Sequence, residues 1–157
     1  MRSKSRAKLP GRVLGQEQAS HAMSSRTTLC GTTGSRSRLR TAHAYLEVAR
    51  LVLDERDRDE HLNVSAGLAV LAGIAVSDSI CCARLRARYR GDDHRGAADL
   101  LRRATPDGVE LATTLLRLLD LKDGAHYGVL VVAARKARDA NRWVTRLVDR
   151  AAEEAER

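Results

Sequence analysis

Aromatic residues and proline are scarce in this chain. Its 157 residues include no phenylalanine, one tryptophan, three tyrosines and two prolines. Strands favour aromatic and β-branched side chains, whereas the alanine and leucine that dominate here have high helix propensity. The composition therefore favours helices over strands, and the length allows one compact domain with a core of its own.

Several motifs of common enzyme classes are also missing. The sequence has no glycine-rich phosphate loop of the Walker or Rossmann type, no nucleophile elbow and no paired metal-ligand motif. We therefore expect neither a metal nor a cofactor. Any chemistry has to come from the histidine and arginine side chains that the sequence does contain.

The cysteines are too few for a disulfide framework. Cys81 and Cys82 are neighbours, and adjacent positions of a helix point about 100° apart, so the two should not bridge each other. We interpret both as small core residues and Cys30 as an unpaired residue in a loose tail. This interpretation predicts a reducing, cytoplasmic environment.

No apolar run is long enough to predict a membrane span. The longest covers residues 64–76 and is followed at once by Ser77-Asp78-Ser79. The basic N-terminal start lacks the apolar core of a secretory signal. We expect a soluble cytoplasmic protein with no membrane partner.

The positive charge is concentrated in the N-terminal segment. The whole chain carries +8, and residues 1–38 hold eight basic residues against the single acid Glu17, which leaves +1 for residues 39–157. Residues 1–35 are also rich in Ser, Thr and Gly and show no apolar periodicity, so we expect a disordered basic tail there and one domain over 36–157. Such a tail could contact RNA non-specifically through its charge, although a solvated arm is the simpler interpretation.

Apolar residues recur at helical spacing from Arg36 onward. The pattern predicts helices over about 36–53, 61–88, 93–103, a segment starting at the Thr105-Pro106-Asp107 sequence, and 132–155. The second carries many small residues that allow close approach, which predicts a central position. Strand-like alternation is nearly absent, so the predicted fold is an all-α, up-and-down bundle of four to five helices.

The strongest candidate site is the stretch RARYRGDDHRGA, residues 86–97. His94 lies near a predicted helix start, where free backbone N–H groups attract anions, and five arginines surround it: Arg84, Arg86, Arg88, Arg90 and Arg95. A neutral imidazole beside a guanidinium is the minimum set for cleaving an RNA phosphodiester without a metal. The simpler interpretation is a polar turn between two helices.

A second polar stretch, LKDGAHYG, covers residues 121–128. Its His126 and Tyr127 can close the bundle by hydrogen bonding, and we regard this structural role as the simpler one.

Residues 39–152 resemble the HEPN superfamily, a set of helical bundles in bacterial toxin–antitoxin and defence systems that are often encoded beside a minimal nucleotidyltransferase. Three segments carry the resemblance: SAGLAVLAGIAVSDSICCARL, GDDHRGA and LLDLKDGAHYG. HEPN ribonucleases use an arginine, four to six residues and a histidine, and the resemblance implies an active site where two subunits bring their copies together. Arg88 and His94, with five residues between them, match that spacing.

The sequence departs from many toxin members in the fourth-helix region. Lys122 stands where those members have an arginine, and only three residues separate it from His126. A lysine cannot form the bidentate contact of a guanidinium. This departure keeps a non-catalytic role open.

Three hypotheses follow. The first is a metal-independent endoribonuclease acting as a homodimer on RNA, with Arg88 and His94 as catalytic residues and five supporting or phosphate-binding residues, Arg90, Arg95, Lys122, His126 and Tyr127. The second is a non-catalytic helical module that docks a nucleotidyltransferase-like protein or binds a nucleotide. The third is a helical oligomer without a ligand.

Overall fold

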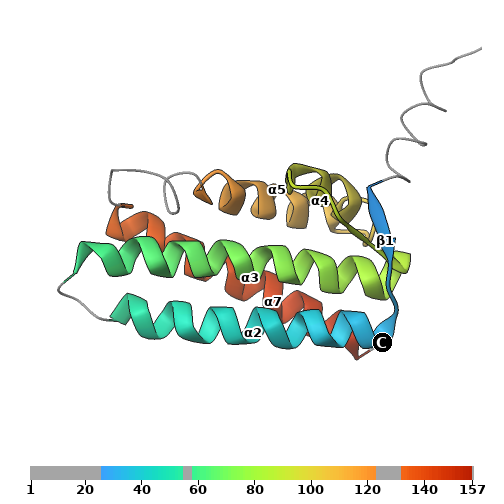
Figure 1. The fold of residues 1–157 in the computed structure, drawn as a ribbon, viewed down its shortest axis with the longest axis horizontal. Helices are drawn as coiled ribbons and strands as arrows, with labels where there is room; N and C mark the ends of the chain where they lie inside the picture. The colour runs from blue at the N-terminus through green and yellow to red at the C-terminus, as the bar shows by residue number, and fades with distance from the viewer. Residues whose placement is uncertain (1–25, 55–57, 123–131, 157) are drawn as a thin grey trace, which may run out of the picture.

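The computed structural model describes residues 26–54, 58–122 and 132–156, and their fold is a helical bundle. Its helices are α2 (Thr32–Asp54), α3 (Asp59–Leu85), α4 (Arg95–Leu101), α5 (Gly108–Leu119) and α7 (Ala134–Ala155). In Figure 1, α2 runs antiparallel to α3 beside it, α7 crosses behind both, and α4 and α5 lie along the other side of α3. The predicted all-α bundle of four to five helices is confirmed.

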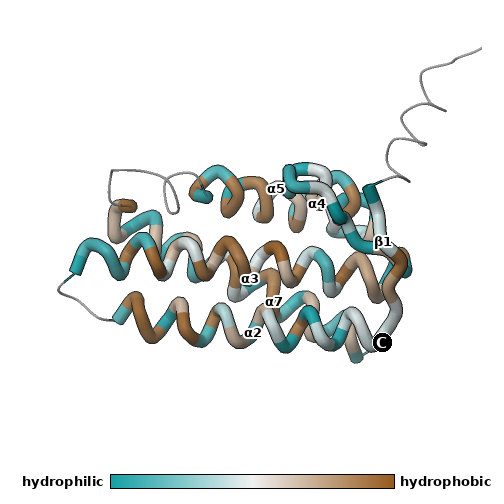
Figure 2. The backbone as a smooth tube through the Cα atoms, in the orientation of Figure 1, coloured by the Kyte–Doolittle hydropathy of each residue, from teal (hydrophilic) through white to brown (hydrophobic). Residues whose placement is uncertain are grey.

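The long helix α3 is the centre of the bundle. Nearly every residue between Ser65 and Cys82 is buried, and apolar residues follow the sides of the helices that face one another (Figure 2). A Cβ atom at Gly73 would lie 2.7 Å from Leu118 Cδ1, so α5 packs directly against bare backbone there. The small residues of α3 thus allow its neighbours to approach closely, as the sequence predicts.

By length and composition α3 is able to cross a membrane. It has 27 residues, and its most apolar 18-residue window has a mean hydropathy of 1.8. The expectation that no segment is long enough counted only the uninterrupted apolar run and not the whole helix. However, 83% of this window is buried inside the fold, which is what the core helix of a soluble protein shows.

Two short strands form a sheet that the sequence did not predict. β1 (Thr27–Leu29) pairs antiparallel with β2 (Ala87–Tyr89). Helix α3 ends at Leu85 rather than at Arg88, because Arg86 adopts the left-handed conformation with φ of 56° and turns the chain into β2. Residues 27–35, which the sequence analysis assigns to a disordered tail, contain β1 and the first turn of α2.

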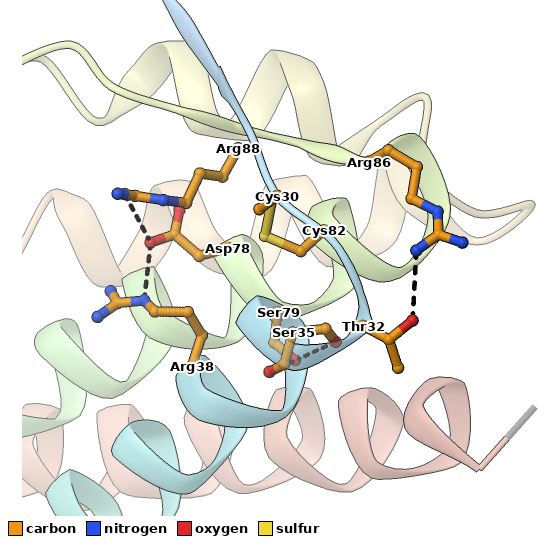
Figure 3. Close-up of a disulfide and its surroundings, with 9 residues drawn as sticks. All are labelled: Cys30, Thr32, Ser35, Arg38, Asp78, Ser79, Cys82, Arg86 and Arg88. Atoms are coloured by element: carbon orange, nitrogen blue, oxygen red, sulfur yellow. Dashed lines mark hydrogen bonds and ion pairs between the residues drawn. A yellow bond between two sulfur atoms is a disulfide. The ribbon is translucent and has the colours of Figure 1, made fainter.

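A disulfide ties the start of the bundle to α3. Cys30 and Cys82 are bonded, with a Cα–Cα distance of 5.2 Å (Figure 3). The interpretation of Cys30 as an unpaired tail residue is wrong, because β1 pairs with β2 and so places Cys30 beside the last turns of α3. Cys81 is free and buried, and burial raises the pKa of its thiol to about 12. As predicted, Cys81 and Cys82 are core residues that do not bridge each other.

Helix α5 begins later than the Thr105-Pro106-Asp107 sequence suggests. The first helical residue is Gly108, whose amide donates to the carbonyl of Thr105 and closes a turn. The Asp107 carboxylate accepts two hydrogen bonds from Arg150, at 2.8 and 3.2 Å, and so ties this turn to α7. The predicted last helix, 132–155, agrees with α7 to within two residues.

An ion cluster joins α7 to α3. The Glu154 carboxylate, with 1% of its side chain exposed, pairs with Arg84 of α3 and with Arg150 one turn earlier on α7. Burial raises the pKa of Glu154, but hydrogen bonds from Arg84 and Arg150 outweigh that effect and lower it. The carboxylate is therefore charged at neutral pH and holds the end of α7 against α3.

Candidate functional site

A buried carboxylate lies at the centre of the candidate site. Asp78 on α3 is 5% exposed. Its Oδ2 atom lies 2.9 Å from Arg38 Nε and 3.7 Å from Arg88 Nη1. In Figure 3 the two guanidinium groups approach this oxygen from opposite sides, one from α2 and one from β2. The sequence predicted Arg88 as a site residue but not Asp78 or Arg38.

The charges around Asp78 do not cancel. Burial raises the pKa of the Asp78 carboxyl, and the charges of Arg38 and Arg88 offset only part of that rise. The Arg38 and Arg88 side chains are 32% and 39% exposed. Because a guanidinium carries five N–H donors, each can hold Asp78 on one side and present further donors on the other. Two cations around one carboxylate leave a net positive site that can attract a phosphate.

His94 lies in the same neighbourhood. It immediately precedes α4 and is half-buried. Burial lowers the pKa of its imidazole, and the charge of Lys122 lowers it further, whereas the charges of Asp78, Asp93 and Asp92 raise it. The net direction is downward, so the imidazole is neutral at pH 7 and able to accept a proton. Asp78 pairs with Arg88 and its charge raises the pKa of His94, so one carboxylate acts on both members of the predicted catalytic pair.

The turn that carries His94 is packed against the aromatic ring of Tyr89. A Cβ atom built on either Gly91 or Gly96 would overlap the Tyr89 ring, so only glycine allows the ring to lie between the two ends of this turn. Tyr89 is the last residue of β2, and Arg88 is its neighbour. The ring therefore links the position of His94 to the strand that carries Arg88.

The backbone donors at the start of α4 are already used. The Arg95 amide donates to Asp93 Oδ1 at 3.0 Å. The amides of Gly96 and Ala97 donate to the carbonyls of Asp93 and His94, at 3.3 and 3.0 Å. A phosphate at this site would therefore contact arginine side chains. It would not bind the backbone N–H groups at the start of α4, as the sequence suggested.

The supporting residues predicted from the sequence are spread around the site. Lys122 is half-buried and close enough to His94 to affect its pKa. Arg95 forms a hydrogen-bonded ion pair with Asp120 at 2.7 Å, with both side chains about 60% exposed, and so joins the start of α4 to the end of α5. The Arg90 side chain is exposed and forms no ion pair within the described residues. His126 and Tyr127 lie outside the described residues.

The described part of the chain contains no group of three or more His, Cys, Asp or Glu side chains that could hold a metal ion. Comparisons of the chain with protein-family models, with curated proteins and with solved structures find no match. The function is therefore argued from the residues of the site.

Proposed function

We propose that this protein is a HEPN-type endoribonuclease of a bacterial toxin–antitoxin or defence system, which cleaves RNA without a metal and acts as a homodimer. One observation supports the proposal above the others: the buried Asp78 carboxylate pairs with the partly exposed Arg88 and acts electrostatically on His94, whose turn packs against Tyr89, the neighbour of Arg88. The site thus combines a proton acceptor with a phosphate-binding cation.

The proposed reaction is an internal transfer at an RNA phosphate. The neutral imidazole of His94 takes the proton of a 2′-hydroxyl, and the resulting oxygen attacks the adjacent phosphorus. The bond from phosphorus to the 5′-oxygen breaks, and that oxygen takes a proton from solvent. The products are a 2′,3′-cyclic phosphate and a 5′-hydroxyl, and His94 then returns its proton to water.

Arg88 stabilises the charge that develops on the phosphate oxygens, because its guanidinium can donate two parallel hydrogen bonds. Asp78 acts as a positioning residue that lies between Arg88 and Arg38 and pairs with both. Lys122 contributes by keeping the His94 pKa low, so that the base is unprotonated at neutral pH.

An exposed apolar side chain beside the site supports the dimer. Leu29 is 88% exposed and is paired in register with Ala87, next to Arg88 on β2. A second copy of the chain on this strand pair would cover Leu29 and bring two sites together. Light scattering should show a dimer that Leu29→Asp converts to monomer, whereas Val109→Asp, at a side chain 65% exposed on α5, leaves it intact. A wild-type monomer would remove the dimer from the proposal.

The main test is cleavage of RNA in EDTA by purified full-length protein. His94→Gln and Arg88→Gln should each lower the rate by roughly 10²–10⁴-fold while helical content is retained. His43→Gln is the matched control, because His43 is an exposed histidine on α2. Cleavage that survives His94→Gln would exclude the proposed base.

The same assay should compare oxidised with reduced protein. A cytoplasmic location is part of the proposal, and disulfides are rare in reducing cytoplasm, so cleavage must stay measurable, at a reduced rate, when Cys30–Cys82 is reduced. Absence of cleavage, together with a stable complex with a nucleotidyltransferase-like partner, would instead favour the non-catalytic module.

A further inference from the structure

A second basic site lies between the C-terminal end of α2 and the N-terminal part of α7, at the other end of the bundle from β2. It is a cavity of about 550 Å³. Arg50 of α2 and four arginines of α7 line it: Arg135, Arg138, Arg142 and Arg146. None of these five residues belongs to the proposed RNA-cleaving site.

The arginines of α7 share one face of the helix. Their spacing of three, four and four residues places each about one turn from the next, over about 16 Å of helix. Arg50 reaches the cavity from α2, where its guanidinium donates to Thr145 Oγ1 at 2.8 Å. The cations therefore converge from two helices on one space.

This cluster has almost no compensating negative charge. Asp139 is the one carboxylate in the lining, and it pairs with Arg142. Arg135, Arg138 and Arg146 have no ion-pair partner within the described residues. Bringing like charges together is unfavourable, and the single Asp139–Arg142 pair offsets only part of it, so the arrangement favours an anionic ligand.

The cavity also has a fixed polar group in its lining. Asn141 is 6% exposed, and its Nδ2 donates to Ser65 Oγ and to the Ala137 carbonyl, both at 2.9 Å. A carbonyl can only accept, which fixes the orientation of the amide and leaves Oδ1 without a hydrogen-bond partner within the described residues. These hydrogen bonds hold α7 against α3 beside the cavity.

We propose that this cavity binds a small molecule of nucleotide size that carries two or more phosphate groups. The volume lies in the range of small-molecule sites, and arginines bind phosphate oxygens in a bidentate manner. Leu53 gives the cavity an apolar wall against which a base can pack. A small molecule fits better than an RNA strand, because the arginines surround one cavity and do not form a track toward Arg88.

The test is calorimetric titration of the full chain, without magnesium, with ATP, GTP, pyrophosphate, orthophosphate and a twelve-nucleotide RNA. At least one nucleoside triphosphate should bind about tenfold or more tightly than orthophosphate. Arg138→Gln and Arg146→Gln should each weaken that binding by about tenfold. Arg40→Gln is the matched control, because Arg40 is exposed on α2 and does not line the cavity.

The proposal is overturned if no nucleotide binds, if the two cavity variants bind as the wild type does, or if only the RNA binds and the variants abolish that binding. The titration is repeated with His94→Gln, which should leave nucleotide binding unchanged. Loss of RNA cleavage and loss of nucleotide binding are thus separate results, and either proposal can fail without the other.

Discussion

The two arginine clusters of this protein differ in what lies between the cations. Arg38 and Arg88 face a buried carboxylate, Asp78. The arginines between α2 and α7 face a cavity, and their one carboxylate neighbour, Asp139, pairs with Arg142. A carboxylate inside a cluster fixes the guanidinium groups, whereas a cluster without one keeps its donors for a ligand. The first arrangement suits a site that must be held in place, and the second suits reversible binding of an anion.

Removing the central carboxylate should have the largest effect on stability. Asp78→Ala leaves Arg38 and Arg88 without their buried partner, and because both guanidinium groups are about one third exposed and can be solvated, the loss should be about 2–3 kcal/mol. Asp139→Ala, at the other cluster, should cost less than about 1 kcal/mol because Arg142 is exposed. Urea denaturation of both variants checks the contrast. Equal losses of unfolding free energy would show that the carboxylate has the same structural role in both clusters.

Removing the disulfide should lower stability by a similar amount and disturb the end of the bundle that carries the first cluster. Cys30→Ser opens a loop closed over 52 residues, for which the chain-entropy model gives about 4 kcal/mol and measured values are typically 2–4 kcal/mol. Thermal unfolding with and without reductant measures the effect. Nucleotide binding in the cavity of α2 and α7 should persist in the folded variant, whereas RNA cleavage should weaken. A uniform loss of both activities would contradict this separation.

The pH dependence of cleavage should report the charges around His94. Because its pKa is lowered from 6.5, the rate should stay level from neutral pH down past 6.5 and fall only at more acid pH, as the imidazole takes up a proton. Lys122→Gln removes one lowering influence and should move the acid limb upward, toward 6.5. Asp78→Asn should move it in the opposite direction, since the Asp78 charge raises the pKa. If neither substitution moves the pH at which the cleavage rate falls, protonation of His94 does not set that pH.

The same lowering predicts a small effect on folding. The folded state resists protonation of His94, so its contribution to stability is present above pH 6.5 and is lost as pH falls through the lower folded-state pKa. His94→Gln should flatten the stability curve in that window, measured by urea midpoints. A curve that keeps its full slope would assign the pH dependence to another group.

The smallest expected effect comes from an exposed ion pair beside the first cluster. Arg95 and Asp120 are both about 60% exposed, and such pairs contribute about 0–1 kcal/mol. Arg95→Gln should therefore change the urea midpoint little and leave cleavage nearly intact. A large loss of cleavage at unchanged stability would assign Arg95 to phosphate binding, as the sequence suggested.

Helical periodicity was enough to predict most of the bundle. The apolar spacing located the five helices that the described residues form, and the small residues around Gly73 predicted the central place of α3. The boundaries near polar turns were less accurate, because they depend on tertiary contacts. Arg86 ends α3 in a left-handed conformation that sequence does not favour for arginine, and β1 forms only because β2 is available to pair with it.

The site was predicted only in part, because half of it depends on tertiary contacts. Arg88 and His94 stand close together in the sequence, so their spacing was visible. Asp78 was seen only as a polar residue after an apolar run, and Arg38 only as one of the basic residues among the first 38, because their pairing joins α2 to α3 across the bundle. The cavity of α2 and α7 was missed entirely. The spacing of four arginines on one helix face was a usable signal, but nothing in the sequence showed that Arg50 lies opposite.

The covalent bond between Cys30 and Cys82 has a consequence for chain continuity. Every peptide bond between α2 and α3 lies inside the ring that this bond closes. A protease that cuts once in that connection would leave two fragments that migrate as one species until a reductant is added. The connection between α2 and α3 is therefore a place where the chain can be cleaved, tagged or given new termini while the disulfide keeps the two fragments covalently joined.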